Sequence, residues 1–148
     1  MAYVILVPTD GSDCAEKAAD YAIDMAKSAG GSILFLNVVD AESPAFTFEL
    51  ERTATSEVNS LLNKLRDAGQ ACVDRLKQRS GDAGVQAETK VVNGHPWEEI
   101  LAEASRSSAD HIIMGSHGRR ALKAAVIGSV AINVIHGAKV PITIIPIA

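Results

Sequence analysis

Short apolar segments rich in β-branched residues alternate along this chain with longer segments of helical periodicity. Five segments have the length and composition of strands: residues 3–7, 33–39, 87–92, 111–115 and 142–147. Runs of this kind, apolar on both faces, are typical of parallel strands that helices cover on both sides. The alternation therefore predicts an open α/β sheet with right-handed crossovers.

Four helical segments lie between these strands. The first opens near Asp13 and Glu16, which have capping-box spacing, and the second runs from about residue 49 to 79, with Gly69 expected to loosen its middle. The third begins at Pro96 and the fourth near Gly128. The apolar positions expected to face the sheet are Val58, Leu61, Leu62, Leu65, Cys72 and Leu76, then Trp97, Ile100, Leu101 and Ala104, then Val130, Val134 and Ile135.

The size and charge of the chain narrow its class. Its 148 residues are expected to form a single domain, residues 1–148. A net charge of -4 argues against nucleic acid or an anionic membrane as a partner. The N-terminus has no basic region before its apolar run, and all apolar runs are strand-sized, so we expect no membrane insertion. Cys14 and Cys72 lack CxxC spacing and are expected to be buried thiols in a reducing, cytoplasmic compartment.

The end of the first strand carries an aspartate. In an open parallel sheet, ligands bind beyond the carboxyl ends of the strands, where the strand order reverses. Asp10 follows the first strand directly. It is interpreted either as a turn former or helix cap, or as a carboxylate that accepts hydrogen bonds from a ribose or coordinates a cation.

A glycine-spaced loop follows the fourth strand. Gly115, Gly118, Gly128 and Ser129 form the pattern G-x2-G-x9-G-S, which starts at a strand end and finishes at a helix start. Free N–H groups of Gly128 and Ser129 at the positive end of a helix dipole would bind an anion. The basic residues inside the loop, which suit a polyphosphate, are Arg119, Arg120 and Lys123. The alternative is a glycine-rich turn with a capping serine and solvated basic residues.

Three stretches together cover the whole chain and carry a resemblance: "YVILVPTDGS", "VVNGHPWEEILAEASRSSADHIIMGSHG" and "IGSVAINVIHGAKVPITIIP". The chain resembles the universal stress protein family, and its unbroken G-x2-G-x9-G-S motif is similar to that of the ATP-binding subgroup. The resemblance implies a five-stranded parallel sheet of order 3-2-1-4-5 with helices on both faces. This is a Rossmann-like fold of the adenine nucleotide alpha hydrolase type.

The resemblance also implies a binding site for ATP. Asp10 would bind the ribose hydroxyls opposite Gly115, and the adenine would meet the backbone of Val39, with Val38 as the alternative register. Gly118, Gly128 and Ser129 would hold the phosphates. The segment from 40 to 53, which matches the family least, would cover the nucleotide. The predicted ligand-binding residues are Pro8, Thr9, Asp10, Val39, Gly115, His117, Gly118, Gly128, Ser129 and Val130.

Nothing in the sequence is arranged for rapid turnover. The chain has no GxxxxGK[ST] motif and no acidic pair suited to a metal clamp, so Mg²⁺ or Mn²⁺ would be held mainly by the phosphates. His117 is the one candidate for proton transfer, and no catalytic residue is assigned. His95 and His136 have no spacing for a metal pair. Slow hydrolysis, or self-phosphorylation at a loop serine, is the enzymatic alternative.

Three other identities share parts of this pattern. A phosphoacceptor receiver domain needs an aspartate after the third strand, which here ends in "VVNG". A pyrophosphatase-type ligase would carry an "SGGxDS"-like loop where this chain has "PTDGSD". A family member that binds no nucleotide, acting as a homodimeric interaction module, is disfavoured by the intact motif.

The last strand predicts an assembly. Residues 142–147 are strongly apolar and are expected at a sheet edge, which invites pairing with another chain. The resemblance implies a homodimer through this strand, whose ladder Pro141 and Pro146 would keep short. The sequence is thus interpreted as a cytoplasmic ATP-binding dimer that acts as a sensor or regulator in the stress response. Nucleotide binding would order residues 116–127, and an unidentified protein partner would read that change.

Overall fold

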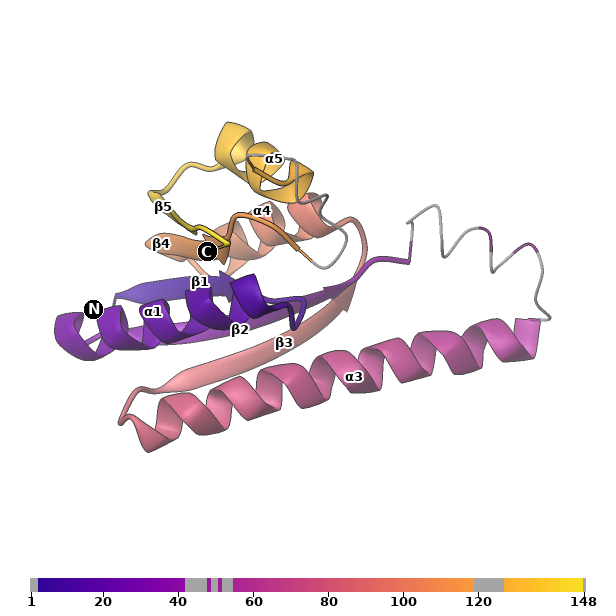
Figure 1. Cartoon of the computed structure of the whole chain (residues 1–148), viewed down its shortest axis with the longest axis horizontal. Coiled ribbons are helices and arrows are strands. Elements are labelled where there is room, and N and C mark those ends of the chain that lie inside the picture. Colours follow the sequence, from indigo (N-terminus) through magenta and orange to yellow (C-terminus); the bar gives the residue numbers. More distant parts are fainter. Residues whose placement is uncertain (1–2, 42–47, 49–50, 52–54, 119–126, 148) are drawn as a thin grey trace.

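The computed structural model describes residues 3–41, 48, 51, 55–118 and 127–147 of the chain (Figure 1). Its elements in chain order are β1 (Val4–Pro8), α1 (Asp13–Ala29), β2 (Ser32–Val39), α3 (Thr55–Asp82), β3 (Ala87–Asn93), α4 (Pro96–Arg106), β4 (His111–Gly115), α5 (Ser129–Gly137) and β5 (Ile142–Ile145). Some predictions fall outside the described residues: most of the 40–53 segment with the start of the second helix, and the basic residues Arg119, Arg120 and Lys123.

The five strands form one parallel sheet of order β3-β2-β1-β4-β5, which confirms the order that the resemblance implies. β1 lies at the centre although it comes first in the chain. The connection from β3 therefore crosses over to β4, and the strand order reverses beside β1. A reversal of this kind opens a crevice beyond the carboxyl ends of the two central strands, which is where α/β proteins bind ligands.

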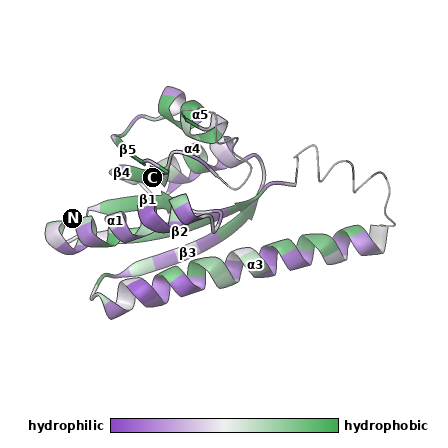
Figure 2. Ribbon diagram, viewed as in Figure 1, coloured by the Kyte–Doolittle hydropathy of each residue, from purple (hydrophilic) through white to green (hydrophobic). Residues whose placement is uncertain are grey.

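Helices cover both faces of the sheet: α1 and α3 lie on one face, and α4 and α5 on the other (Figure 1). Ile5 and Val7 of β1 pack towards α1 and α3, whereas Leu6 packs towards α4 and α5, because successive side chains point to opposite faces. Figure 2 shows hydrophobic central strands and helices with one hydrophilic side. Among the described residues, none of the helices combines the length and apolar composition that a membrane crossing requires.

The N-cap of the first helix lies one residue before the predicted one. Ser12, not Asp13, is the N-cap, and its side chain accepts the N–H of Ala15. The predicted capping box of Asp13 and Glu16 is therefore wrong. Asp13 lies in the first turn, where its negative charge is favourable next to the positive end of the helix dipole.

Helix α3 differs from its prediction in the middle and at its N-terminal half. Gly69 does not loosen it, because α3 runs unbroken from Thr55 to Asp82. Cys72 and Leu76 are buried as expected, but the side chain of Leu65 is 38% exposed. The reason is geometric: the N-terminal half of α3 extends past the carboxyl edge of the sheet (Figure 1), so less of the fold is available to cover it.

Helices α4 and α5 pack on the opposite face. Ile100 and Val134 are buried there, as predicted, but Ile135 is 45% exposed and does not face the sheet. One residue escaped the sequence prediction: Glu103 of α4 is only 4% exposed. Its carboxylate accepts hydrogen bonds from Lys90 at 2.9 Å and from Arg106 at 2.7 Å, which compensates the burial of its charge.

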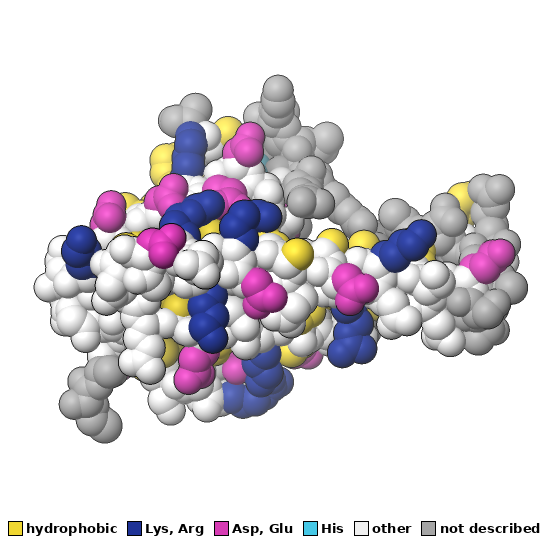
Figure 3. All heavy atoms as spheres, turned by 90° about the horizontal axis from the view of Figure 1, so that it is seen from below, with side chains coloured by type: hydrophobic (Ala, Val, Ile, Leu, Met, Phe, Trp, Pro, Cys, Tyr) yellow, Lys and Arg dark blue, Asp and Glu magenta, His cyan; other side chains and the backbone are white. Residues whose placement is uncertain are grey.

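Ion pairs join α1 to α3. Glu16 of α1 pairs with Arg75 and Arg79 of α3, at 3.0 and 2.9 Å, and Arg79 also pairs with Asp20 at 2.9 Å. Burial alone would raise the pKa of Glu16, but the hydrogen bonds and charges of the two arginines outweigh it and lower the pKa. Figure 3, which looks onto this side of the molecule, shows basic and acidic side chains interspersed.

Candidate functional site

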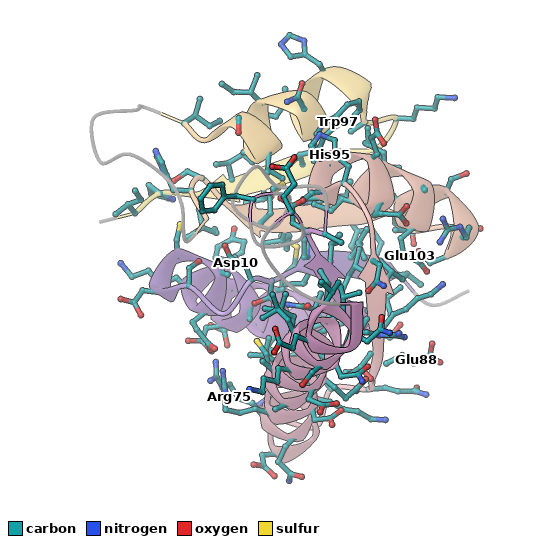
Figure 4. All side chains as sticks on the ribbon, turned by 90° about the vertical axis from the view of Figure 1, so that its right-hand side faces the viewer. Asp10, Arg75, Glu88, His95, Trp97 and Glu103 are labelled. Atoms are coloured by element: carbon teal, nitrogen blue, oxygen red, sulfur yellow. The ribbon has the colours of Figure 1, made fainter. Side chains whose placement is uncertain are left out.

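A cavity of about 420 Å³ lies beyond the carboxyl ends of β1, β2 and β4, at the start of α5. Its walls come from both ends of the chain, and Figure 4 looks towards this edge of the sheet. All ten residues predicted to bind the ligand line this cavity: Pro8, Thr9, Asp10, Val39, Gly115, His117, Gly118, Gly128, Ser129 and Val130. The structure thus brings the end of the first strand and the glycine-spaced motif together.

Asp10 lies in the tight turn that connects β1 to α1. Its Oδ1 accepts the N–H of Ser12 at 2.9 Å, and the next residue, Gly11, has a φ of +79°, a conformation that favours glycine. Thr9 holds the same turn, because its Oγ1 accepts the N–H of Gly11 at 3.2 Å. The turn role considered for Asp10 is therefore realised, and its side chain is also exposed at the cavity.

Each of the three glycines of the motif lies at a close contact within the protein. A Cβ on Gly118 would lie 2.5 Å from Asp10 Oδ2, so Gly118, rather than Gly115, faces this carboxylate. A Cβ on Gly115 would lie 2.7 Å from Cys14 Sγ in α1. A Cβ on Gly128 would lie 3.0 Å from the carbonyl of Ser116. The glycine spacing therefore lets β4, its following loop and α5 approach α1 and Asp10.

The start of α5 offers backbone N–H groups to the cavity, with one correction to the prediction. The N–H of Gly128 is not free, because it donates to the carbonyl of Ser116 at 2.7 Å. The helical hydrogen bonds begin with Ile132, which donates to Gly128, and no side chain caps the helix. The first-turn N–H groups that point out of the helix are thus those of Ser129, Val130 and Ala131, all of which line the cavity.

Ser116 and His117 form a polar pair in the cavity wall. Ser116 Oγ and His117 Nδ1 are 2.8 Å apart, a hydrogen bond whose donor depends on the histidine tautomer. Both residues are buried, at 5% and 8% exposed. Ser116 also donates its N–H to the carbonyl of Ile145 in β5 at 2.8 Å. The pair therefore fixes the imidazole at the point where β4 leaves the sheet.

The backbone register of β2 distinguishes Val38 from Val39. The carbonyl of Val39 accepts the N–H groups of Gly94 and Ala41, each at 3.0 Å, so it is used within the protein. In a parallel strand, the backbone groups of consecutive residues point alternately towards the two neighbouring strands. Val38 therefore directs its backbone groups towards β1 and the cavity, and Val39 contributes a buried side chain to the wall.

Several cavity residues were not predicted. Ser116 and Asn37 supply polar groups, and Leu65, Gly69 and Cys72 of α3 supply an apolar wall. A polar residue inside the apolar run of β2 was the one signal in the sequence for Asn37. The α3 wall carries no such signal, because its residues are part of an ordinary apolar helix stripe.

His95 and His136 are not among the residues that line the cavity. His95 precedes α4 with its ring edge-on to Trp97, at 5.8 Å between centroids (Figure 4), and His136 lies in the last turn of α5. Within the part of the chain that the structure describes, no three His, Cys, Asp or Glu residues are grouped as they would be to hold a metal ion.

Comparison with protein families gives a match over residues 1–146 to the universal stress protein family. The chain belongs to the universal stress protein family. It is 35% identical over 141 residues to universal stress protein MJ0531 of Methanocaldococcus jannaschii, a match that covers 95% of this chain and 80% of that protein. The family assignment and the strand order agree with the adenine nucleotide alpha hydrolase-like fold predicted from the sequence.

Solved structures of the family share this fold. The structure of hypothetical protein MJ0577, also from Methanocaldococcus jannaschii, has a TM-score of 0.85 and 31% sequence identity, with 100% of this chain and 98% of that chain covered. A universal stress protein in complex with cAMP has a TM-score of 0.67 over 97% of this chain and 95% of that chain. Its sequence identity of 22% makes it a relative in fold.

Proposed function

We propose that this chain binds an adenine nucleotide, ATP foremost, and acts as a nucleotide-dependent sensor or regulator in the stress response. The observation that carries the proposal is the cavity at the switch point of the sheet, lined by the whole glycine-spaced motif and by the residues that follow β1. Family membership supports it, and a relative of the same fold was solved with cAMP. A volume of about 420 Å³ falls in the usual range for small-molecule sites.

The donors around the cavity fit a nucleotide in one orientation. The phosphates would accept hydrogen bonds from the N–H groups of Ser129, Val130 and Ala131 at the positive end of α5, whose first turn contains no acidic residue. The carboxylate of Asp10 would accept hydrogen bonds from the ribose hydroxyls. The base would reach the N–H and C=O groups of Val38, which is the alternative register to Val39.

A divalent cation, Mg²⁺ or Mn²⁺, would accompany the phosphates and neutralise part of their charge. We propose that the phosphates themselves hold it. The carboxylate of Asp10 is an acidic group of the cavity wall beside the glycine loop, since its Oδ2 lies against Gly118. One carboxylate suits a phosphate-bound cation better than a closed protein cage.

Binding and signalling, rather than turnover, fit the polar groups of the wall. Hydrolysis needs a positioned water or base, and His117 already uses Nδ1 in its hydrogen bond with Ser116. The same pair supports the second candidate, slow ATP hydrolysis or transfer of a phosphoryl group to a loop serine. No catalytic residue is assigned.

The assembly and compartment follow as further parts of the proposal. We propose a homodimer that pairs through β5, the edge strand of the sheet, and an additional protein partner that responds to the bound nucleotide. The cytoplasm is the proposed compartment, and Cys14 and Cys72, both free and buried, fit its reducing conditions.

The test is a calorimetric titration of nucleotide-stripped protein with Mg-ATP, ADP and AMP. We expect saturable binding that weakens as phosphates are removed. Gly118→Val should lower the affinity for ATP by at least about tenfold, or ~1.4 kcal/mol, because its side chain would displace the Asp10 carboxylate. Gly81→Val is the matched control, since a Cβ there meets no atom within 4 Å. Absence of binding to all three nucleotides would contradict the proposal and favour a nucleotide-free interaction module.

A further inference from the structure

One polar side chain interrupts the buried part of β2. Asn37 is 9% exposed, and its neighbours Phe35 and Leu36 are fully buried. Burying a carboxamide is costly unless its groups are hydrogen-bonded. Its Nδ2 donates to the carbonyl of Thr9 at 2.9 Å, so the bond ends on the backbone of the cavity wall.

The pairing of β2 shows which bond the carboxamide replaces. The carbonyl of Leu36 accepts the N–H of Thr9 at 2.8 Å, and that of Val39 accepts the N–H of Gly94. The backbone N–H and C=O groups of even-numbered β2 residues therefore point towards β1, and those of odd-numbered residues point towards β3. If the ladder with β1 continued by one step, the N–H of Val38 would donate to the carbonyl of Thr9. The β1–β2 register instead ends at Pro8 and Leu36.

We propose that Asn37 is a positioning residue of the ligand site. Its carboxamide occupies the Thr9 carbonyl, ends the β1–β2 ladder, and leaves both backbone groups of Val38 directed into the cavity. An adjacent N–H and C=O match an adenine edge, in which the N1 acceptor lies beside the N6 amino donor. The inference rests on the proposed function for the identity of this ligand. The placement of the carboxamide itself depends only on the free protein.

Helix α3 is adapted to this carboxamide. A Cβ on Gly69 would lie 2.3 Å from Asn37 Oδ1 and 2.9 Å from its Cγ. The side chain is already fixed through Nδ2, so it could not yield without releasing Thr9. Gly69 thus lets α3 close over Asn37, which explains a glycine in the middle of an unbroken helix.

The first experiment measures amide hydrogen exchange in the nucleotide-free protein by NMR. In Asn37→Leu the Thr9 carbonyl loses the hydrogen bond from the carboxamide. We expect the N–H of Val38 to donate to this carbonyl instead. Exchange at Val38 should then slow by about tenfold while the rest of the chain exchanges as fast or faster. Val73→Ala, a core change in α3 outside the cavity, is the control and should not slow Val38. Unchanged or faster exchange at Val38 in Asn37→Leu would overturn the proposal.

The second experiment separates base recognition from phosphate binding. We expect Asn37→Leu to lower the affinity for Mg-ATP by about tenfold and to leave that for inorganic triphosphate unchanged, because only the base uses Val38. Equal losses for both ligands would show general damage and overturn the positioning role. If the wild-type protein binds neither ligand, the proposed function fails, and exchange at Val38 still decides the role of Asn37.

Gly69→Ala provides an independent route if Asn37→Leu does not fold. Its Cβ would push the carboxamide away from Thr9, so Val38 should again become protected and the affinity for ATP should fall. Gly81→Ala in the same helix has open space around it and should change neither property. Unaltered Val38 exchange in Gly69→Ala would count against the proposal.

Discussion

His111 is a buried histidine held between two hydroxyl groups. Its Nδ1 lies 2.9 Å from the hydroxyl of Tyr3, and its Nε2 lies 2.7 Å from Thr143 Oγ1. A neutral ring satisfies both contacts, with one nitrogen accepting and the other donating. Burial lowers the pKa of His111, because the charged ring would lose hydration there. This residue therefore ties β4 and β5 together in its neutral form.

A pH dependence of folding follows. Below about pH 6.5 the unfolded chain protonates this histidine while the folded chain keeps it neutral, so stability should fall as the pH drops. His111→Gln should remove that part of the slope, and His136→Gln, an exposed position, should not. Urea unfolding between pH 5 and 8 measures the slopes. Identical slopes for wild type and His111→Gln would contradict the prediction.

Single residues also show the limits of sequence interpretation. Glycine spacing, strand ends and the family resemblance together selected ten residues that line one cavity. They could not show that the N–H of Gly128 is already bonded to Ser116, because that contact arises only when the loop closes on α5. They also missed Asn37, whose partner Thr9 lies 28 residues away in the chain. Bonds between distant segments leave little trace in local patterns.

At the scale of elements, the contact between α1 and β4 depends on Gly115. Its Cα lies against Cys14, whose Sγ and backbone carbon would be 2.7 and 3.1 Å from an added Cβ. The thiol also donates to the carbonyl of Ile145 in β5 at 3.2 Å. The first turn of α1 therefore packs against the ends of β4 and β5.

Gly115→Ala should lower the free energy of unfolding by about 1–3 kcal/mol, as overpacking of a core does. The loss should be smaller in a Cys14→Ala background, because the nearest clashing atom is then absent. A double-mutant cycle in chemical denaturation measures this coupling. Strict additivity of the two changes would show that the contact between Cys14 and Gly115 does not limit the packing.

The elements were predicted more completely than their ends. Among the described residues, periodicity located the five strands and the helices α1, α3, α4 and α5, because burial on one or two faces imposes it directly. The strand order came from the family resemblance, since periodicity carries no information on which strands are neighbours. The exposure of Ile135 could not be predicted, because it depends on how little of the short helix α5 meets the sheet.

At the scale of the whole molecule, the open edge of the sheet at β5 bears on how two copies could assemble. β5 is an outer strand. The carbonyl of Pro141 accepts the N–H of Ile112 in β4, and the carbonyl of Ile145 accepts the N–H of Ser116, directly after β4. Alternation then directs the backbone groups of Ile142 and Ile144 away from the sheet. Pro146 has no N–H to donate, so an added strand would find only a short ladder. We expect this edge to form a small, self-complementary contact between two copies.

We expect the protein to sediment as a dimer and Ile144→Pro to dissociate it, because proline removes an outward N–H without removing a bond to β4. Ile147→Ala, beyond the strand and 44% exposed, should leave the dimer intact. Sedimentation velocity at matched concentrations distinguishes these outcomes. A monomeric wild-type protein, or a dimeric Ile144→Pro variant, would contradict pairing through β5.

The central position of β1 has a consequence for biosynthesis. β1, β2 and β3, with α1 and α3, can assemble while the rest of the chain is still being translated, since their contacts are between successive segments. The cavity cannot, because its walls come from residues as distant in the chain as Pro8 and Ala131. Domains with such long-range contacts fold late and slowly. A ribosome-bound chain would therefore carry half of a sheet with an exposed face, and the ligand site would form only after α5 has emerged.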